Sequence, residues 1–128
     1  MSVAVAASEI PRADWPRFLD EFSRAHRGWL ITVEEDSPEG KRELVREVPL
    51  SGVSAALDGS RSDITIIAGP RETEWTHRID SPAALRLKKT PDGAEAGIEA
   101  ESAGGTRTTV RFRSAVLPET VDGMVPEP

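Results

Sequence analysis

The chain has 128 residues and a formal net charge of −6, with 38% hydrophobic and 30% charged residues. This length suits one soluble domain that buries a core without disulfides, and the negative charge opposes binding to nucleic acids and anionic membranes. Because cysteine is absent, disulfides, thiolate nucleophiles and cysteine-ligated metal sites are excluded.

The two ends of the chain differ in composition from its middle. Residues 1–9 are small and without periodicity, so a flexible arm is expected there, and they lack the features of a signal peptide. Residues 10–115 are expected to form a single domain, followed by a disordered, acidic and proline-rich tail over 116–128. No window is apolar for long enough to span a membrane, so a cytoplasmic protein without a membrane partner is expected.

The first ordered element is predicted to be an amphipathic helix over residues 14–26. Asp14 is the expected N-cap, and Gly28 is the expected left-handed residue that ends the helix. The stripe expected to be buried recurs at helical spacing and consists of Trp15, Phe18, Leu19, Phe22 and Ala25.

The other side of this helix is predicted to face solvent. His26 is interpreted as a structural residue at the negative end of the helix dipole, rather than as a ligand or a base. The ion pairs expected on the solvent face are Arg17–Glu21 and Asp20–Arg24.

After the helix the hydrophobic period changes to two, which indicates β-strands. The predicted strands lie at 29–34, 44–50, 53–57, 64–68, 73–79, around 85–87, and at 96–100 and 108–112. The predicted fold class is therefore α+β, with the helix packed on a curved antiparallel sheet of seven or eight strands, either barrel-like or a sandwich.

Two hairpins have a predicted register. A four-residue loop over 69–72 would place Ile66 opposite Trp75 and Ile64 opposite His77, which keeps the apolar side chains on one face. The last hairpin is expected to turn through a three-residue loop over 103–105, with Gly105 as its left-handed residue. The cross-strand pairs expected in that hairpin are Glu101–Arg107 and Glu95–Arg113.

The segment with the strongest resemblance to a binding site is Trp75 to Arg78. Trp75 and His77 are predicted to share one face of a strand, and Arg78 lies on the other. An aromatic ring beside a titratable imidazole can bind a small ligand, whereas the alternative is that Trp75 belongs to the core and His77 is a half-buried structural residue. No nucleophile–histidine or paired-histidine spacing is present, so no catalytic residue, metal ligand or cofactor is predicted.

Two charged clusters have alternative interpretations. The acidic cluster Glu34, Glu35, Asp36 and Glu39 does not match a calcium loop and is expected to be a solvated hairpin tip. An arginine stripe could bind RNA, but its neighbours are acidic and no aromatic residues are interleaved, so no nucleic-acid partner is expected. The stripe is Arg107, Arg111 and Arg113, and its expected neutralising partners are Glu95, Glu99 and Glu101.

The helix and several strands carry motifs that resemble a known family. The helical motif is Trp15-x-x-Phe18-Leu19-x-x-Phe22-Ser23, followed by His26-Arg27-Gly28-Trp29. Together with Pro49-Leu50-x-Gly52-Val53 and Val110-Arg111-Phe112-Arg113-Ser114, it resembles a bacterial family of small uncharacterised single-domain proteins, a domain of unknown function. The resemblance extends over about residues 10–114. It implies a bacterial source and a stand-alone domain, and it transfers no activity or catalytic residue.

The sequence alone does not specify a function. It favours a non-enzymatic binding or protein-interaction module, because an unpaired sheet edge can accept a strand from a protein partner or from a second copy. The alternative is a small-ligand or enzymatic pocket around Trp75 and His77.

Overall fold

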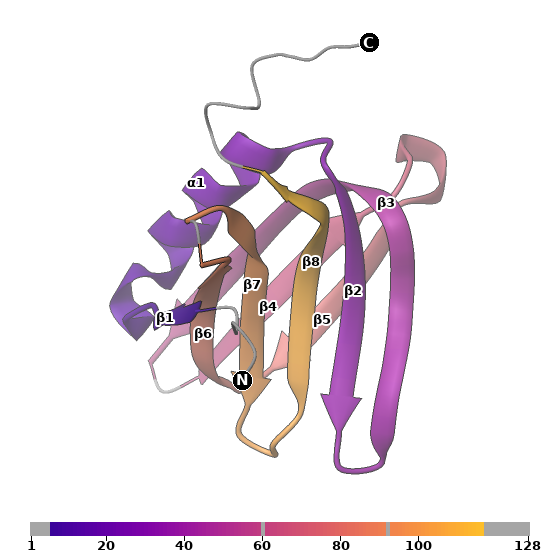
Figure 1. Ribbon diagram of the computed structural model, residues 1–128. Coiled ribbons are helices and arrows are strands. Elements are labelled where there is room, and N and C mark those ends of the chain that lie inside the picture. Colours follow the sequence, from indigo (N-terminus) through magenta and orange to yellow (C-terminus); the bar gives the residue numbers. More distant parts are fainter. Residues whose placement is uncertain (1–5, 60, 92, 117–128) are drawn as a thin grey trace, which may run out of the picture.

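The computed structural model describes residues 6–59, 61–91 and 93–116 (Figure 1). The described chain has an α-helix, α1 (Trp15–His26), preceded by a 3-10 turn, η1 (Arg12–Asp14). The strands are β1 (Ala6–Glu9), β2 (Leu30–Ser37), β3 (Gly40–Asp58), β4 (Arg61–Ala68), β5 (Trp75–Asp80), β6 (Pro82–Lys89), β7 (Glu95–Ser102) and β8 (Arg107–Val116). A second 3-10 turn, η2 (Arg71–Thr73), lies between β4 and β5. The predicted α+β class is therefore confirmed.

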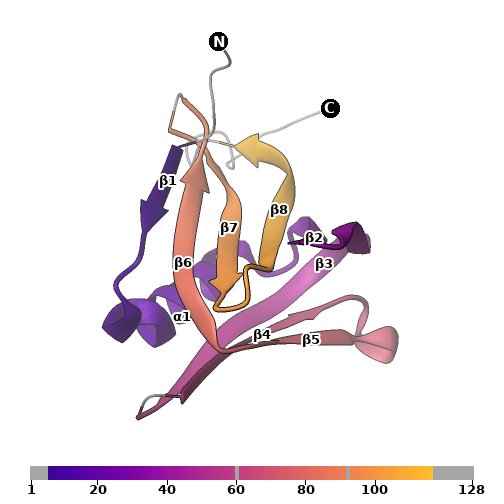
Figure 2. The same cartoon turned by 90° about the horizontal axis from the view of Figure 1, so that it is seen from below.

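All described strands belong to one antiparallel sheet of eight strands, in the order β1-β6-β7-β8-β2-β3-β4-β5. The sheet does not close into a barrel, because β1 and β5 are its two ends. Figure 2 shows β4 and β5 diverging from β6, β7 and β8 beyond the long strand β3. The sheet is curved as predicted, and among the described residues no strand pairs with the outer edge of β1 or of β5.

Strand β3 is continuous over 19 residues, whereas the sequence pattern predicted two strands separated near residues 51–52. Its first part pairs with β2 and its second part pairs with β4. Irregular pairings, rather than a turn, let the strand bend: the register shifts between Leu50 and Gly52, and Glu47 has a positive φ of 53°. The backbone N–H of Glu47 donates to the hydroxyl of Thr32 at 3.2 Å, which stabilises this bend.

The buried face of α1 is rotated slightly from the predicted stripe. Phe18 is only half-buried and Ala25 is exposed, so the prediction that Ala25 belongs to the stripe was wrong. The helix packs on β3, and the Ser23 hydroxyl accepts a hydrogen bond from the Val53 backbone N–H at 2.8 Å. This contact orients the helix so that its buried residues are Trp15, Leu19, Phe22, Ser23 and His26.

The ends of α1 agree only partly with the prediction. Gly28 has the expected positive φ, 88°, immediately after the helix. Asp14 occupies the N-cap position but makes no capping hydrogen bond, because its carboxylate pairs with Arg17 at 3.2 Å. Arg17 therefore pairs with Asp14 rather than with Glu21 as predicted, whereas the expected Asp20–Arg24 pair is present at 2.6 Å.

The core lies where α1 meets the curved sheet. Its helical residues pack against apolar side chains from seven strands. The buried strand residues of this cluster are Ile31, Val33, Leu50, Val53, Ile64, Ile66, Ala68, Ile79, Leu85, Ile98, Ala100, Val110 and Phe112. Of the four expected helix anchors, Trp15, Leu19 and Phe22 belong to this cluster, whereas Phe18 is only partly buried and packs against it.

Strand β1 was not expected, because its residues fall within the range predicted as a flexible arm. It pairs with β6, with Ala7 opposite Lys88 and Glu9 opposite Arg86. Residues 1–5 of the predicted arm, and residues 117–128 of the predicted tail, lie outside the described residues.

The β7–β8 hairpin confirms the predicted loop, with Gly105 at a φ of 95° and Glu101 opposite Arg107. The predicted Glu95–Arg113 pair was wrong, because the register shifts between Glu95 and Gly97. Gly97 has a φ of 147°, and its Cα lies so close to β8 that an added Cβ would be 2.0 Å from the Val110 carbonyl oxygen. This β-bulge beside Gly97 has its extra residues on β8, where residues 112–115 lie opposite Ala96 alone, and it moves Glu95 away from Arg113.

Candidate functional site

The strand that carries the predicted site, β5, is the last strand of the sheet. It pairs with β4 on one side, and no described strand pairs with its other edge (Figure 2). An edge strand presents unpaired backbone N–H and C=O groups, which can bind an additional strand. The outer edge of β5 is therefore chemically able to accept a partner.

The register of β5 differs by two residues from the prediction. Ala68 lies opposite Trp75 and Ile66 lies opposite His77, because η2 extends the connection to six residues, 69–74. A shift of two residues preserves the face on which each side chain lies. Trp75 and His77 therefore share the inner face with buried Ile79, as the alternating pattern predicted.

Trp75 and His77 are both half-buried, and their rings are stacked. The ring centroids are 5.5 Å apart and the ring planes differ by only 4°. Arg78 lies on the exposed face, where it forms ion pairs with Asp63 at 3.0 Å and Asp80 at 3.2 Å. The structure thus brings Trp75 and His77 together and separates both from Arg78.

His26, the other histidine, is buried in an aromatic cluster that joins the end of α1 to the sheet. Its ring centroid is 4.5 Å from those of Phe22 and Trp29, and 4.6 Å from that of Phe112. The Nδ1 atom lies 2.8 Å from the Phe22 carbonyl oxygen, which can only accept, so Nδ1 carries a hydrogen. The Nε2 atom lies 3.0 Å from a Glu95 carboxylate oxygen. These contacts support the structural interpretation of His26.

Removing the Glu95 carboxylate is expected to destabilise the domain through His26. The change Glu95→Ala should lower the free energy of unfolding by about 1–2 kcal/mol, because it leaves a buried imidazole nitrogen without its partner. In a His26→Phe background the same change should cost less than about 0.5 kcal/mol. Urea unfolding of the four proteins measures the coupling, and equal losses in both backgrounds would show that the pair contributes nothing.

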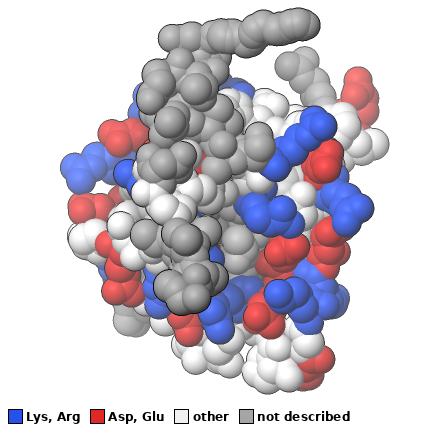
Figure 3. All heavy atoms as spheres, viewed as in Figure 1, with Lys and Arg blue, Asp and Glu red and all other residues white. Residues whose placement is uncertain are grey.

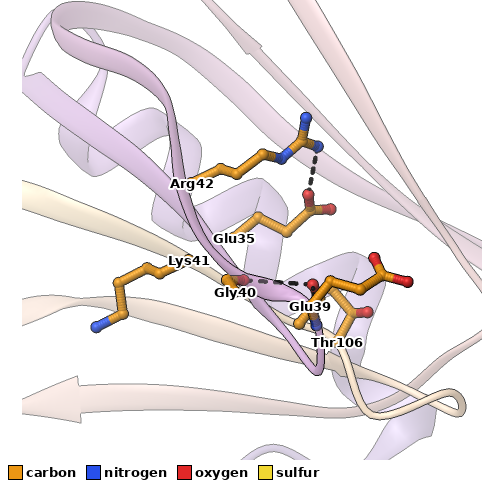
Figure 4. Close-up of a pocket in the computed structure, with 7 residues that line it drawn as sticks. Glu35, Glu39, Gly40, Lys41, Arg42 and Thr106 are labelled. Atoms are coloured by element: carbon orange, nitrogen blue, oxygen red, sulfur yellow. Dashed lines mark hydrogen bonds and ion pairs between the residues drawn. The ribbon is translucent and has the colours of Figure 1, made fainter.

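Three pockets formed by described residues lie elsewhere on the surface, and none is lined by Trp75 or His77. The pocket drawn in Figure 4 has a volume of about 500 Å³ and lies at the β2–β3 hairpin. There Arg42 is paired with Glu35 at 2.6 Å, and the Ser37 hydroxyl donates to the Gly40 carbonyl oxygen at 3.3 Å. Among the described residues, no group of three or more potential ligands is placed to hold a metal ion.

A second pocket, of about 290 Å³, lies on the outer face of the sheet, where acidic and basic side chains interleave (Figure 3). The prediction that β7 carboxylates neutralise the arginine stripe was right only for Arg107, which lies 3.8 Å from Glu99. The other two partners come from different strands, because β8 lies between β7 and β2. These pairs are Arg111–Glu34 at 2.9 Å and Arg113–Glu47 at 3.9 Å.

Arg86 is the centre of the charge network on this outer face. Its guanidinium lies 3.0 Å from Glu101, 3.4 Å from Glu99 and 3.9 Å from Glu9. The hydrogen bond to Glu101 raises the pKa of Arg86, and the charges of the three carboxylates act in the same direction, while burial opposes them. The network satisfies its own charges, so this face has no strong excess of either sign.

Comparison with known proteins assigns the sequence to a family. The sequence model of a family of unknown function, DUF5335, matches residues 6–120, which include every described helix and strand. The chain belongs to the DUF5335 family. No curated protein and no solved structure matches it. Membership of DUF5335 agrees with the resemblance to a domain of unknown function, and it assigns no activity to any residue.

Within the described residues, no helix has the length and apolar character needed to cross a bilayer.

Proposed function

We propose that this DUF5335 domain is a non-enzymatic interaction module of the bacterial cytoplasm, and that it binds a protein strand along the outer edge of β5. One observation carries the proposal: an open edge coincides with a half-buried, stacked Trp75–His77 pair on the same strand. Backbone groups of the edge supply affinity for a strand, and the ring pair supplies side-chain contacts.

Strand length and residue composition favour β5 over β1, the other edge strand, as the site where a partner strand binds. Strand β1 has only four residues, Ala6–Glu9, and three of them are alanine or serine. Strand β5 has six residues, and its inner face continues the apolar surface of β4. Aromatic side chains are enriched in protein interfaces, so β5 is the edge better suited to a specific partner.

A lysine at the inner face of β5 tests this proposal, because inward-pointing charges on an edge strand oppose pairing. The full chain and its His77→Lys variant are used to capture partners from an extract of the source cells. A partner that binds the unmodified chain should be lost with His77→Lys and retained with Ala25→Lys, which adds the same charge on the exposed side of α1. Thermal unfolding checks that both variants fold.

Capture that is equal for both variants would contradict the proposal. A small-ligand pocket at Trp75 and His77 is the alternative function. A small ligand bound there would quench the fluorescence of Trp75 but would protect no backbone amide of β5 from hydrogen exchange. A bound strand, in contrast, would protect those amides.

A further inference from the structure

We infer that the strand bound along β5 is β5 of a second copy of this chain, in antiparallel pairing centred on Thr76. The inference rests on the proposed function and specifies its partner. The observation behind it is that residues 74–78, Glu-Trp-Thr-His-Arg, are complementary to themselves when one copy is reversed.

A two-fold axis through the sheet places residues opposite each other only if their numbers add to twice that of the central residue. With Thr76 at the centre, Glu74 lies opposite Arg78 of the second copy, and this ion pair occurs twice. Trp75 lies opposite His77 of the second copy, also twice, so the inner face gains a block of four rings. The two threonines meet at the axis, and opposite charges and aromatic pairs are favourable across strands.

The registers centred nearer the C-terminal end of β5 are less favourable. A centre at Arg78 places the two Arg78 guanidinium groups opposite each other, and a centre at His77 places Glu74 opposite Asp80. A centre at Ile79 leaves little overlap, because β5 ends at Asp80 and Ser81 has a positive φ of 52°. Like charges directly opposite each other are destabilising, so the Thr76 register is preferred.

The described side chains suit this register. Glu74 is exposed and has extended backbone angles, φ −64° and ψ 135°, so it can lengthen β5 by one residue. The carboxylate of Glu74 accepts one exposed hydrogen bond from Ser51 at 3.2 Å, which a pair with Arg78 of the second copy would replace. Arg78 is 61% exposed and is held in place by Asp63 and Asp80.

Five residue pairs form a small interface, so the dimer should be weak. Interfaces well below the standard size give transient complexes, and a dissociation constant between about 10 µM and 1 mM is expected. Sedimentation velocity over about 10 µM to 1 mM protein should therefore show a reversible monomer–dimer equilibrium. A chain that stays monomeric up to about 1 mM would overturn the inference.

Charge reversal at the seam tests the register. Glu74→Arg should weaken the dimer about tenfold, because it replaces two attractive pairs with two repulsive ones. Arg78→Glu should do the same, and the double variant Glu74→Arg/Arg78→Glu should restore dimerisation to within about threefold of the unmodified chain. Glu21→Arg, which reverses an exposed charge on α1, is the matched control and should leave the dimer unchanged.

Glu74→Arg is the variant with the smaller risk to folding, because Arg78 also pairs with Asp63 and Asp80 within its own chain. An unchanged dissociation constant for Glu74→Arg would overturn the Thr76 register. If the chain is monomeric but captures another protein in a manner lost with His77→Lys, the proposed function stands and the second copy is excluded as the partner.

Discussion

Replacing Gly97 by alanine is expected to lower the free energy of unfolding by about 3 kcal/mol or more. An alanine Cβ would lie 2.0 Å from the Val110 carbonyl oxygen, and the φ of 147° at this position is one that side chains rarely adopt. Relief of the overlap would require β7 and β8 to separate at the bulge. Urea unfolding measures the loss.

Gly104→Ala is the control for this change, because it lies in the same hairpin and an added Cβ would meet nothing within 4 Å. It should change the free energy of unfolding by less than about 1 kcal/mol. If Gly97→Ala were no more destabilising than Gly104→Ala, the close approach of β7 to β8 would be incorrect.

Replacing Phe22 by alanine is expected to cost about 3–5 kcal/mol, the range for a fully buried aromatic side chain. Phe22 is 5% exposed and its ring stacks on that of Phe112, with centroids 5.7 Å apart. It also contacts His26, so its removal opens a cavity between α1 and the sheet.

Phe18→Ala provides the comparison for Phe22, since it removes an identical side chain from the same helix at a half-buried position. Its loss should be less than half that of Phe22→Ala, because less apolar area leaves the core. Chemical unfolding of both variants decides the point. A loss below about 1 kcal/mol for Phe22→Ala would show that this residue does not anchor the helix.

The helix and the last loop were predictable because their signals are local. Apolar spacing located α1. Gly28 and Gly105 both have the predicted positive φ, because the end of a helix and a short hairpin loop each require a left-handed residue at a position set by the adjacent sequence. The prediction placed Ala25 on the buried stripe, because spacing alone does not set how a helix rotates on its sheet. The Ser23 contact with β3, which fixes that rotation, joins residues 30 positions apart.

The irregular parts of the sheet could not be predicted from the pattern. The bend in β3 and the bulge beside Gly97 depend on contacts with a neighbouring strand, and the register of β5 depends on the turn η2, which lengthens its connection to β4. The bulge also explains why the predicted Glu95–Arg113 pair does not form. The Glu95 carboxylate contacts His26 instead. The period of two still placed Trp75 and His77 on one face, because a shift of two residues preserves the face.

The position of β5 at the edge of the sheet could not be predicted from the sequence, because it depends on the strand order, which no local pattern contains. The self-complementary spacing of residues 74–78 was present in the sequence, but it acquires meaning only for a strand with a free edge. Strand β1 was missed because its small residues give no periodic signal and it is ordered by pairing with β6.

Mixing the two single charge-reversal variants tests the central claim most directly. Glu74→Arg and Arg78→Glu each place like charges across the β5 seam, but a dimer of one with the other contains two attractive pairs. The account predicts that each variant alone is largely monomeric, and that an equimolar mixture sediments as a heterodimer with nearly the affinity of the unmodified chain. A mixture that associates no more tightly than either variant alone would contradict pairing of β5 about Thr76.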